Sequence, residues 1–371
     1  MNAPKIRFND FNDEWVEYIL QSESDVRDGT HDSPKYVDNG YPLITSKNLT
    51  DMGTLDFSNV SYLKQEDFDK INQRSKVDIG DILFGMIGTI GKPVRIDRDD
   101  FAIKNVALIK EKGLIKNDYL IHYLHTPTIN KQFANNQDGG TQKFIALDKI
   151  RKLKIKMPSR KEQEKIVSLF NLLDKKIELQ SKKIEDLKLF KKGLSNKIFS
   201  TLDVVKEEKL GNICNITTGK LDANAMVENG QYRFYTCAKD YYYIDKYAFD
   251  TEALLISGNG AYVGYIHYYK GKFNAYQRTY VLDKFTENIQ YIKVYLDEFL
   301  SKRINSEKKE GNTPYIVLST LSDMMIKLTN VTDENKVINT FNNINNKIDK
   351  EELKLNKLIE LKKGLMQNMF V

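Results

Sequence analysis

A glycine-rich run is the first place in the chain where backbone and side chains together could do chemistry. Residues 85–93 read GMIGTIGKP, a composition similar to that of loops that bind nucleotide phosphates. The Walker pattern requires a glycine five positions before the Gly–Lys pair and a serine or threonine after it, because that hydroxyl binds magnesium. Met86 and Pro93 occupy those two positions. The run therefore predicts a turn between strands, as does its counterpart SGNGAYVG at residues 257–264.

Metal ligands and catalytic nucleophiles are sparse in this sequence. Among four histidines and two cysteines, His122 and His125 lie three residues apart on a predicted helix, but no third ligand recurs near them. There is no GxSxG elbow, no Cys–His motif, no dinucleotide fingerprint and no Asn-Pro-Pro or Asp-Pro-Pro tetrapeptide of amino-methyltransferases. We therefore expect a non-catalytic chain without a metal or cofactor of its own. Because 51 side chains are acidic, a nuclease or methyltransferase with an unrecognised carboxylate pair remains an alternative.

Composition and charge limit the class of protein. The hydrophobic fraction of 41% is enough to form real cores, and no run of about 18 apolar residues predicts a membrane-spanning helix. The charged N-terminus does not match a signal peptide, and two cysteines suit a reducing cytoplasm, where we expect the protein. The net charge of +6 is concentrated in residues 159–199, while residues 1–158 and 200–332 are neutral overall. This charge permits nucleic-acid binding without demonstrating it.

The chain contains an internal repeat. Residues 165–199 align without a gap with residues 336–370, and both segments carry the sequence KKGL and end in a phenylalanine, Phe199 or Phe370. The same offset continues upstream through matched glycines and apolar residues to the glycine-rich turn of each copy. The chain is therefore two copies of one plan, a variable front half followed by a long helix.

Both repeated segments have the spacing of a coiled-coil seam. Apolar residues alternate at intervals of four and three, which is the 3.5-residue period of supercoiled helices. The seam positions are Ile166, Phe170, Leu173, Ile177, Ile184, Leu187, Leu194 and Ile198 in the first copy and Val337, Phe341, Ile344, Ile348, Leu355, Leu358, Leu365 and Met369 in the second. Polar residues interrupt both seams at equivalent places, Gln180 and Lys191 against Glu351 and Lys362. We expect two long paired helices; two ordinary amphipathic core helices are the alternative.

The front half of each copy predicts a mixed α+β domain. Short runs rich in strand-forming residues are separated by Gly, Asn and Asp turns. These runs are residues 41–45, 82–84, 102–109, 253–256 and 276–282. A helix is expected over residues 117–135 in the first copy and 289–304 in the second. The expected boundaries are a front domain at 1–157, a helix at 158–200, a second front domain at 201–330 and a second helix at 331–371.

This organisation resembles that of the specificity (S) subunit of type I restriction–modification enzymes, and the resemblance covers the whole chain. The stretch MPSRKEQEKIVSLFNLLDKKI at residues 157–177 is typical of the central conserved region of that family. The repeated KKGL, the helix-ending Phe199 and Phe370, and the domain entries at residues 15–20 and 208–211 also match. The implied fold is α+β, with two target recognition domains separated by two long antiparallel coiled-coil helices and related by a pseudo-two-fold internal repeat.

The resemblance implies a function in DNA recognition. Each target recognition domain would read one half of a bipartite, asymmetric target in double-stranded DNA, and the helices would set the spacer and dock two modification (methyltransferase) subunits. Restriction (translocase and nuclease) subunits would complete the assembly, and S-adenosylmethionine, ATP and Mg would be used in those other subunits. The alternative is a structural adaptor whose helical hairpin binds proteins and whose front domains bind a ligand other than DNA.

The resemblance also directs attention to residues that could contact DNA. Reading requires hydrogen-bond groups for base edges and cations for phosphates, on loops where glycines let the backbone approach closely. The candidates in the first domain are Arg27, Thr30, His31, Lys35, Thr45, Ser46, Lys47, Asn48, Thr89, Lys92, Gln142 and Lys143. Those in the second domain are Lys220, Tyr235, Thr236, Lys239, Asn259, Tyr262, Gln277, Arg278, Asn312, Thr313 and Tyr315. Lys92, Lys143, Asn259 and Arg278 are favoured because their segments recur in both copies, and the tyrosines at 241–243 predict packing rather than base stacking.

Overall fold

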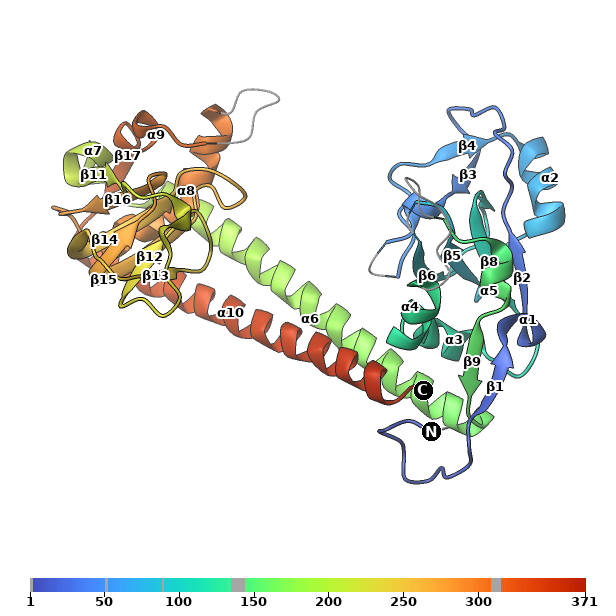
Figure 1. The fold of residues 1–371 in the computed structure, drawn as a ribbon. Coiled ribbons are helices and arrows are strands. Elements are labelled where there is room, and N and C mark those ends of the chain that lie inside the picture. Colours follow the sequence, from blue (N-terminus) through green and yellow to red (C-terminus); the bar gives the residue numbers. More distant parts are fainter. Residues whose placement is uncertain (1–2, 51–52, 89, 135–143, 308–314) are drawn as a thin grey trace. The chain divides into compact units, whose positions relative to one another are not determined.

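Two compact units make up the chain (Figure 1). The computed structural model describes residues 3–50, 53–88, 90–134, 144–307 and 315–371. The first unit comprises Met1–Ser181 and Leu353–Val371, and the second comprises Lys182–Glu352. Each unit therefore contains one front domain together with one end of each of the two long helices.

The first unit contains three small sheets. Their strand orders are β2-β8-β5-β6, β4-β3-β7 and a β1-β9 ribbon. The strands are β1 Val16–Ile19, β2 Ser24–Asp28, β3 Tyr41–Ile44, β4 Ser61–Leu63, β5 Ile82–Gly85, β6 Gly91–Arg95, β7 Ala102–Ile103, β8 Val106–Glu111 and β9 Lys154–Met157. Strand β5 is a continuous apolar run because both faces of its sheet are covered. Ile82 and Phe84 pack into one hydrophobic core, and Leu83 packs into a second core on the opposite face.

Short helices accompany these sheets. They are α1 Leu20–Glu23, the 3₁₀ turn η1 Ser46–Asn48, α2 Gln65–Ser75, α3 Asn117–Leu124, α4 Pro127–Ala134 and α5 Leu147–Arg151. The sequence predicted one helix over residues 117–135, and the structure has two, α3 and α4. Pro127 explains the break, because proline lacks the N–H that would continue α3 and is suited to the first position of a new helix. Tyr119 and Tyr123 of α3 belong to the core of this unit.

One six-stranded sheet forms the centre of the second unit. Its strand order is β11-β16-β14-β15-β12-β13, and a separate ribbon pairs β10 with β17. The strands are β10 Lys206–Lys209, β11 Asn215–Thr218, β12 Tyr232–Tyr235, β13 Tyr242–Ile244, β14 Phe249–Ser257, β15 Ile266–Ala275, β16 Thr279–Asp283 and β17 Met325–Leu328; the shorter helical elements are α7 Leu210–Ile213, η2 Ala223–Ala225, α8 Ile289–Glu307 and α9 Leu318–Ser322. Leu254 packs into a core shared with α8, and Leu255 packs into a separate core on the other face.

Two long helices correspond to the repeated segments. The first, α6, runs over Arg160–Thr201, and the second, α10, runs over Val331–Asn368. Their 42 and 38 residues correspond to about 63 and 57 Å of helix at about 1.5 Å per residue. Every seam position named from the sequence is buried or half-buried.

Within each unit, α6 and α10 pair in opposite directions. The contacts that show this are Asp174–Lys362 and Phe170–Phe370 in the first unit, and Lys183–Glu351 and Phe199–Phe341 in the second. In both units the partner's residue number falls along α10 as the number rises along α6. The helices are therefore antiparallel, as the sequence predicted.

Ion pairs form at the polar positions that interrupt the seams. The carboxylate of Glu351, whose side chain is only 7% exposed, lies 3.1 Å from the ammonium of Lys183. Lys191 pairs with Glu298 of α8 at 2.7 Å, and the second interrupting cation, Lys362, pairs with Asp174 of α6. A slipped register would leave the buried carboxylate of Glu351 without this cation, at a cost below the value of about 3–5 kcal/mol for a fully buried pair, because Lys183 is 51% exposed. The Glu351 pair therefore favours one register of the helices over slipped alternatives.

The end of α10 completes the core of the first unit. The ring of Phe370 lies 5.7 Å from the rings of Tyr119 and Tyr123, 5.5 Å from that of Phe170 and 6.5 Å from that of Trp15. Phe370 is only 6% exposed. A side chain of the second sequence copy is thus part of the core of the first front domain.

The end of α6 has the reciprocal place in the second unit. The ring of Phe199 lies 5.5 Å from that of Tyr295, 4.9 Å from that of Phe299 and 5.9 Å from that of Phe341. Each front domain therefore contains in its core a helix end that the other sequence copy encodes.

Within the ranges given above, no group of three or more His, Cys, Asp or Glu side chains is placed to hold a metal ion. No helix in the same part of the chain is both long enough and apolar enough to cross a membrane.

Candidate nucleic-acid interface

The two units share a backbone frame at the ends of their strands. In the first unit the N–H of Lys104 donates to the carbonyl of Ile44 at 2.9 Å, which joins the β7–β8 connection to the end of β3. In the second unit the N–H of Tyr276 donates to the carbonyl of Tyr235 at 2.9 Å, which joins the β15–β16 connection to the end of β12. These bonds hold corresponding loops in the same place although their side chains differ.

Two further backbone hydrogen bonds recur in both units. They are Asn105 N to Thr30 O (3.2 Å) with its counterpart Gln277 N to Leu221 O (2.9 Å), and Ile145 N to Met86 O (2.9 Å) with its counterpart Ile316 N to Gly258 O (2.8 Å). Together with the first pair of bonds, they involve five segments of each domain that are far apart in sequence. Most of the residues expected to contact DNA lie on these segments. This set of backbone hydrogen bonds could not be predicted from a sequence motif, because it is formed by main-chain groups that nearly every residue carries.

The first unit places several candidate side chains at the surface of this frame. His31, Lys35 and Lys47 are exposed, whereas Thr30 and Thr45 are half-buried.

Lys92 is half-buried and has a left-handed backbone with φ of 49°, directly after Gly91 with φ of 85°. Non-glycine residues adopt this conformation uncommonly, and such strain concentrates at functional sites. The strained turn at Lys92 is consistent with its place among the favoured residues.

The imidazole of His31 is held at both of its nitrogens. Nδ1 lies 2.7 Å from Oδ1 of Asn105, and Nε2 lies 2.9 Å from Oδ2 of Asp28. The other oxygen of Asp28 accepts from Arg74. Both neighbours of the ring can act as acceptors, so the doubly protonated imidazolium satisfies both bonds. The hydrogen bond to Asp28, followed by that to Asn105, raises the pKa of His31.

We expect His31 to titrate above the ordinary histidine pKa of about 6.5. Its stabilisation of the first unit should be fully present below that pKa and should disappear as the pH rises through the raised value. Histidine ring NMR between pH 5 and 9 measures this, with the His31→Ala spectrum giving the assignment. His267 is the control, because burial lowers its pKa. A midpoint for His31 at or below 6.5 would contradict the bonding pattern.

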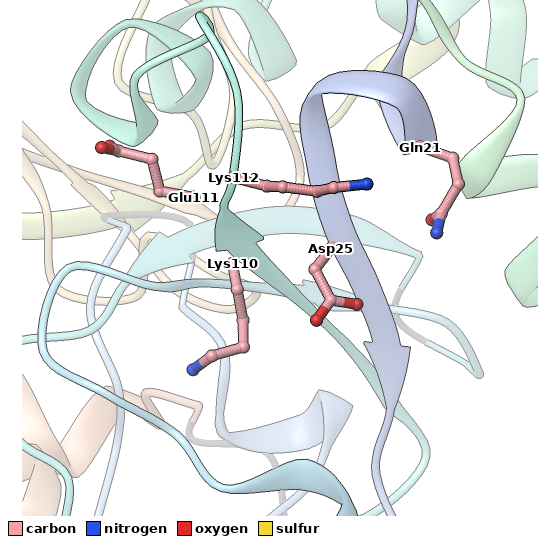
Figure 2. A pocket seen from close by; sticks show the side chains of 5 residues that line it. All are labelled: Gln21, Asp25, Lys110, Glu111 and Lys112. Carbon is pink, nitrogen blue, oxygen red and sulfur yellow. The ribbon is translucent and has the colours of Figure 1, made fainter.

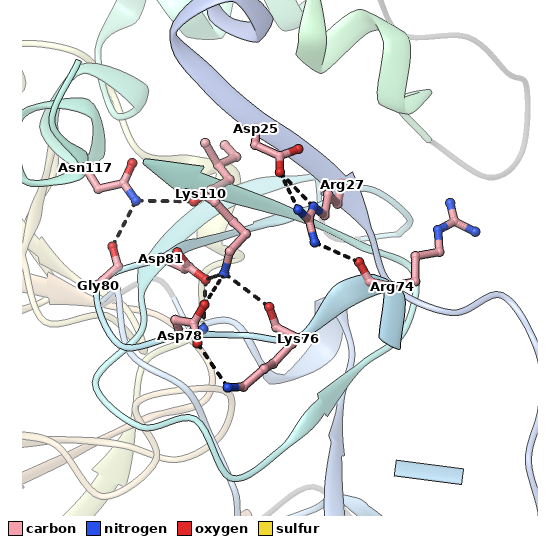
Figure 3. A network of polar contacts seen from close by, with 10 residues as sticks. Asp25, Arg27, Arg74, Lys76, Asp78, Gly80, Asp81, Lys110 and Asn117 are labelled. Carbon is pink, nitrogen blue, oxygen red and sulfur yellow. Dashed lines mark hydrogen bonds and ion pairs between the residues drawn. The ribbon is translucent and has the colours of Figure 1, made fainter. Parts of the chain in front are cut away.

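Arg27, a candidate for contact with DNA, forms a half-exposed ion pair within the protein, and its contact with DNA stays a prediction. Its Nε and Nη2 donate to Oδ2 of Asp25 at 2.8 and 2.6 Å, and its Nη1 donates to the carbonyl of Arg74 at 3.2 Å. Figure 3 shows this pair beside a second one, in which Lys110 pairs with Asp78 at 2.7 Å. The guanidinium of Arg27 joins strand β2 to the end of α2, and its side chain is 41% exposed.

A depression of about 400 Å³ lies near this network, away from the shared frame. Its lining side chains are Gln21, Asp25, Lys110, Glu111 and Lys112 (Figure 2). The two cations and two anions balance each other, and none of these residues was expected to contact DNA. The depression therefore does not mark the candidate interface.

The second unit has a polar depression directly on the frame. Its volume is about 310 Å³, and it is lined by Thr218, Gly258, Gln277, Arg278, Tyr280, Tyr315 and Ile316. Three residues predicted to contact DNA are therefore neighbours here: Gln277, Arg278 and Tyr315, whose ring is 61% exposed. Asn259 is bridged to Tyr315 through the backbone. Throughout residues 144–307 and 315–371, no carboxylate forms an ion pair with Arg278.

Further cations and a tyrosine lie on loops that neighbour the lining residues in sequence or by backbone hydrogen bonds. Lys220 and Lys239 are exposed. The ammonium of Lys239 lies 5.7 Å from the centre of the Tyr262 ring. Cations supply phosphate contacts, and tyrosine supplies a hydrogen-bonding hydroxyl and a flat surface. The arrangement has the groups that DNA binding requires.

Two candidates in the first domain have side chains in the interior, and this corrects the expectation. The amide nitrogen of Asn48 donates to the carbonyl of Asp56 at 3.0 Å, and its oxygen accepts from the N–H of Thr45 at 2.9 Å. The hydroxyl of Ser46 donates to the carbonyl of Asn105 at 3.2 Å. Asn48 and Ser46 are 6% and 4% exposed, so they shape the loop and do not face a ligand.

Two candidates in the second domain are also interior. Tyr235 is 1% exposed, and its ring packs with Tyr269 and Phe273 at 5.8 and 5.9 Å. Thr236 is 6% exposed. Both side chains belong to the domain interior and not to a DNA-facing surface. The remaining candidates lie outside the described residues: Thr89, Gln142, Lys143, Asn312 and Thr313.

The sequence interpretation also missed surface groups. Lys104 lies on the frame and donates to Oγ of Ser33 at 2.8 Å, yet no glycine-rich turn or repeat marked it. The tyrosines at 241–243, predicted to pack, are 36%, 41% and 44% exposed. A strand pattern does not show which strands lie at the edge of a sheet, and β13 is such an edge strand.

Comparison with known proteins gives a consistent picture. The family model described as "Type I restriction modification DNA specificity domain" matches residues 30–189 and again residues 203–361. The chain is 32% identical over 162 residues to the type I restriction enzyme EcoDI specificity subunit of Escherichia coli, covering 44% of this chain and 36% of that protein. It is 29% identical over 174 residues to the putative MjaX specificity subunit of Methanocaldococcus jannaschii, covering 43% of this chain and 39% of that protein. The chain thus matches well under half the length of each of these relatives.

Solved structures share the fold. The type I restriction–modification S subunit from M. genitalium superposes with a TM-score of 0.67 at 18% identity, covering 100% of this chain and 99% of that one. A chain from a study of complex assembly and conformational transition of the type I R-M system superposes with a TM-score of 0.59 at 13% identity, covering 95% of this chain and 96% of that one. The two-domain, two-helix architecture is therefore common to all three chains.

Proposed function

Because the chain belongs to the type I restriction–modification DNA specificity family, we propose that its two front domains are target recognition domains that read the two halves of a bipartite DNA target. The family model matches once in each half of the chain. The two matched domains hold equivalent loops with equivalent main-chain hydrogen bonds. A duplicated frame of this kind suits two contacts along one duplex.

The difference between the side chains on the shared frame is the observation that carries this proposal. Where the first domain has Lys104 and Asn105, the second has Tyr276, Gln277 and Arg278. Base edges are distinguished by their pattern of donors and acceptors, so unlike side chains in like places select unlike sequences. The proposed target is therefore asymmetric.

The paired helices would set the spacer between the half-sites and dock the modification subunits. Their registered ion pairs and buried seam make a stiff element. Apolar side chains remain exposed on α6, with Leu172 and Leu179 at 53% and 57% in the first unit and Leu189 and Phe190 at 69% and 60% in the second. Exposed apolar patches mark protein interaction sites. Catalysis would belong to the docked modification and restriction subunits, with their S-adenosylmethionine, ATP and Mg.

A selection experiment tests the proposal. The full chain, alone and with modification subunits from the same host, is incubated with a pool of randomised duplexes, and the bound DNA is sequenced. We expect two conserved half-sites separated by a spacer of fixed length. If neither preparation enriches a sequence, the adaptor alternative is favoured and DNA reading is rejected.

Replacing Arg278 by alanine should weaken binding to the selected target by about 1–3 kcal/mol, the range for a good base contact. The loss should be confined to sites that carry the preferred base, because Arg278 lies in the depression of the second domain only. Titration of labelled duplexes at one salt concentration measures it. Lys270→Ala is the control, because Lys270 is paired with Glu252 at 3.4 Å. Unchanged affinity of Arg278→Ala would contradict its assignment to the interface.

A further inference from the structure

Arg233 on strand β12 is a cation held in place by aromatic rings. Its guanidinium carbon lies 4.2 Å from the centre of the Tyr241 ring and 4.6 Å from that of the Tyr269 ring. Tyr241 is in turn packed against Tyr243, with ring centres 5.6 Å apart. Arginine stacks on aromatic faces through its own plane. These contacts restrict both the position and the orientation of the Arg233 head group.

The hydrogen bonds of Arg233 leave one edge of the guanidinium without a protein acceptor. Nη1 donates to the hydroxyl of Tyr235 at 3.3 Å. Nε and Nη2 have no acceptor in the part of the chain that the structure describes, and no carboxylate there pairs with Arg233. Arg233 as a whole is half-buried. A fully enclosed nitrogen without an acceptor would be a buried unsatisfied atom, and neither Nε nor Nη2 is one. Both nitrogens are therefore open to solvent.

The same edge binds acceptor pairs elsewhere in this protein. In Arg7, Nε and Nη2 each donate to one carboxylate oxygen of Glu162, both at 2.8 Å. In Arg98, Nε and Nη2 donate to the two carboxylate oxygens of Asp100. The Arg98 guanidinium also lies over the ring of Phe57, so a ring contact and a two-donor edge occur together there. Arg233 thus combines an ordered guanidinium with a two-donor edge that the described chain does not use.

Arg233 adjoins the loops of the candidate interface. The segment from Cys237 to Tyr241 connects them: Sγ of Cys237 contacts the carbonyl of Arg278 at 3.4 Å, and Lys239 lies over the Tyr262 ring. The same segment then supplies Tyr241, which covers Arg233. Arg233 and the depression of the second domain are therefore joined by five residues of chain.

The first domain has no counterpart of this group. The parallel pair of β3 and β7 in the first domain corresponds to the parallel pair of β12 and β15 in the second. In this correspondence Leu43 of β3 is equivalent to Phe234 of β12. The residue before each is Pro42 in the first domain and Arg233 in the second. Whatever Arg233 recognises is recognised by the second domain alone.

We propose that Arg233 is a specificity-determining residue whose Nε–Nη2 edge donates two hydrogen bonds to the O6 and N7 atoms of a guanine in the half-site of the second recognition domain. The inference rests on the proposed DNA-reading function. A bidentate donor to O6 and N7 is the most common specific contact to guanine in the major groove. A phosphate can also accept two bonds from an arginine, so the restricted plane of the ring-packed guanidinium is the observation that favours a base edge. Fixing the plane matters when the two acceptors are offered in one orientation, as they are on a base edge.

The test compares target motifs between variants of the full chain. Randomised duplexes are selected by the wild type, Arg233→Lys and Arg233→Met, with the modification subunits present, and affinities are then titrated on duplexes that differ at one base pair. Lysine keeps the charge and methionine keeps the apolar packing, so the pair separates base reading from a structural role. Circular dichroism and thermal unfolding confirm that each variant is folded.

We expect both variants to lose a preference for guanine at one position of one half-site, by about 5- to 150-fold, and to keep the other half-site and the spacer. Arg98→Lys, whose edge is filled by Asp100, should leave the whole motif unchanged.

Three outcomes would overturn the assignment. One is an unchanged motif with both Arg233 variants. Another is a uniform loss of affinity on all duplexes with a smaller salt slope, which would make Arg233 a phosphate ligand. The third is a loss with methionine alone and full rescue of the motif by lysine. Failure of the wild type to select any motif would instead reject the proposed function itself.

Discussion

Replacing Phe370 by alanine should lower the free energy of unfolding of the first unit by about 3–5 kcal/mol, the usual cost of removing a buried aromatic ring. The ring is in contact with Trp15, Tyr119, Tyr123 and Phe170, so its removal leaves a cavity among large, stiff side chains. Hydrogen exchange followed by mass spectrometry measures the effect on peptides from α3, because a two-unit chain does not unfold in a single step.

Matched variants make this result specific. Phe199→Ala should weaken the second unit by a similar amount and leave α3 protected, because Phe199 packs with Tyr295, Phe299 and Phe341. Phe190→Ala should change either unit by no more than about 0.5 kcal/mol, because its ring is 60% exposed. If Phe370→Ala left exchange in α3 unchanged, the end of α10 would not be part of that core.

Inserting four residues after Lys182 should remove the preference for the intact bipartite target or lengthen its spacer. The insertion adds about 6 Å to α6 and rotates the seam, because four residues do not fit the heptad period. It also displaces the second-unit residues of α6 from their α10 partners, such as Lys183 from Glu351. Selection from randomised duplexes with variable spacers measures the outcome.

The control insertion avoids the helices. Four residues placed after Asp99, in the exposed turn between β6 and β7, should leave the spacer and both half-sites intact. An α6 insertion that kept the original spacer at full affinity would show that the helices do not define the separation of the half-sites.

The helices could be predicted in detail because their signal is periodic. Residues such as Ile184 and Leu355 recur at the heptad spacing, which places them all along the seam of a coiled coil. Each of them is buried or half-buried in the structure, as this spacing predicts. The partners of the polar interruptions could not be predicted. Glu298, which pairs with Lys191, lies on α8, and its approach depends on the packing of the whole domain.

The loops were predicted less well because composition does not give the direction of a side chain. Asn48 follows the exposed candidate Lys47 in the sequence, yet its side chain points inward, as does that of Tyr235. The bond of Arg27 to Asp25 could not be predicted either, because composition does not show which partner a guanidinium takes. Arg233 carried no signal at all, since it lies inside a strand and away from every glycine-rich turn.

The place of Phe370 in the first core has a consequence for synthesis on the ribosome. The residues around it, from Trp15 to Phe170, are made first, but Phe370 follows about 200 residues later. At about 5–20 residues per second, this part of the first domain must wait about 10–40 s with an apolar surface uncovered. A nascent chain is therefore exposed to chaperones and proteases during that interval, and a prematurely terminated chain never closes it. Phe370, which follows the end of α10, thus becomes available to the core of the first domain only after the second domain has been translated.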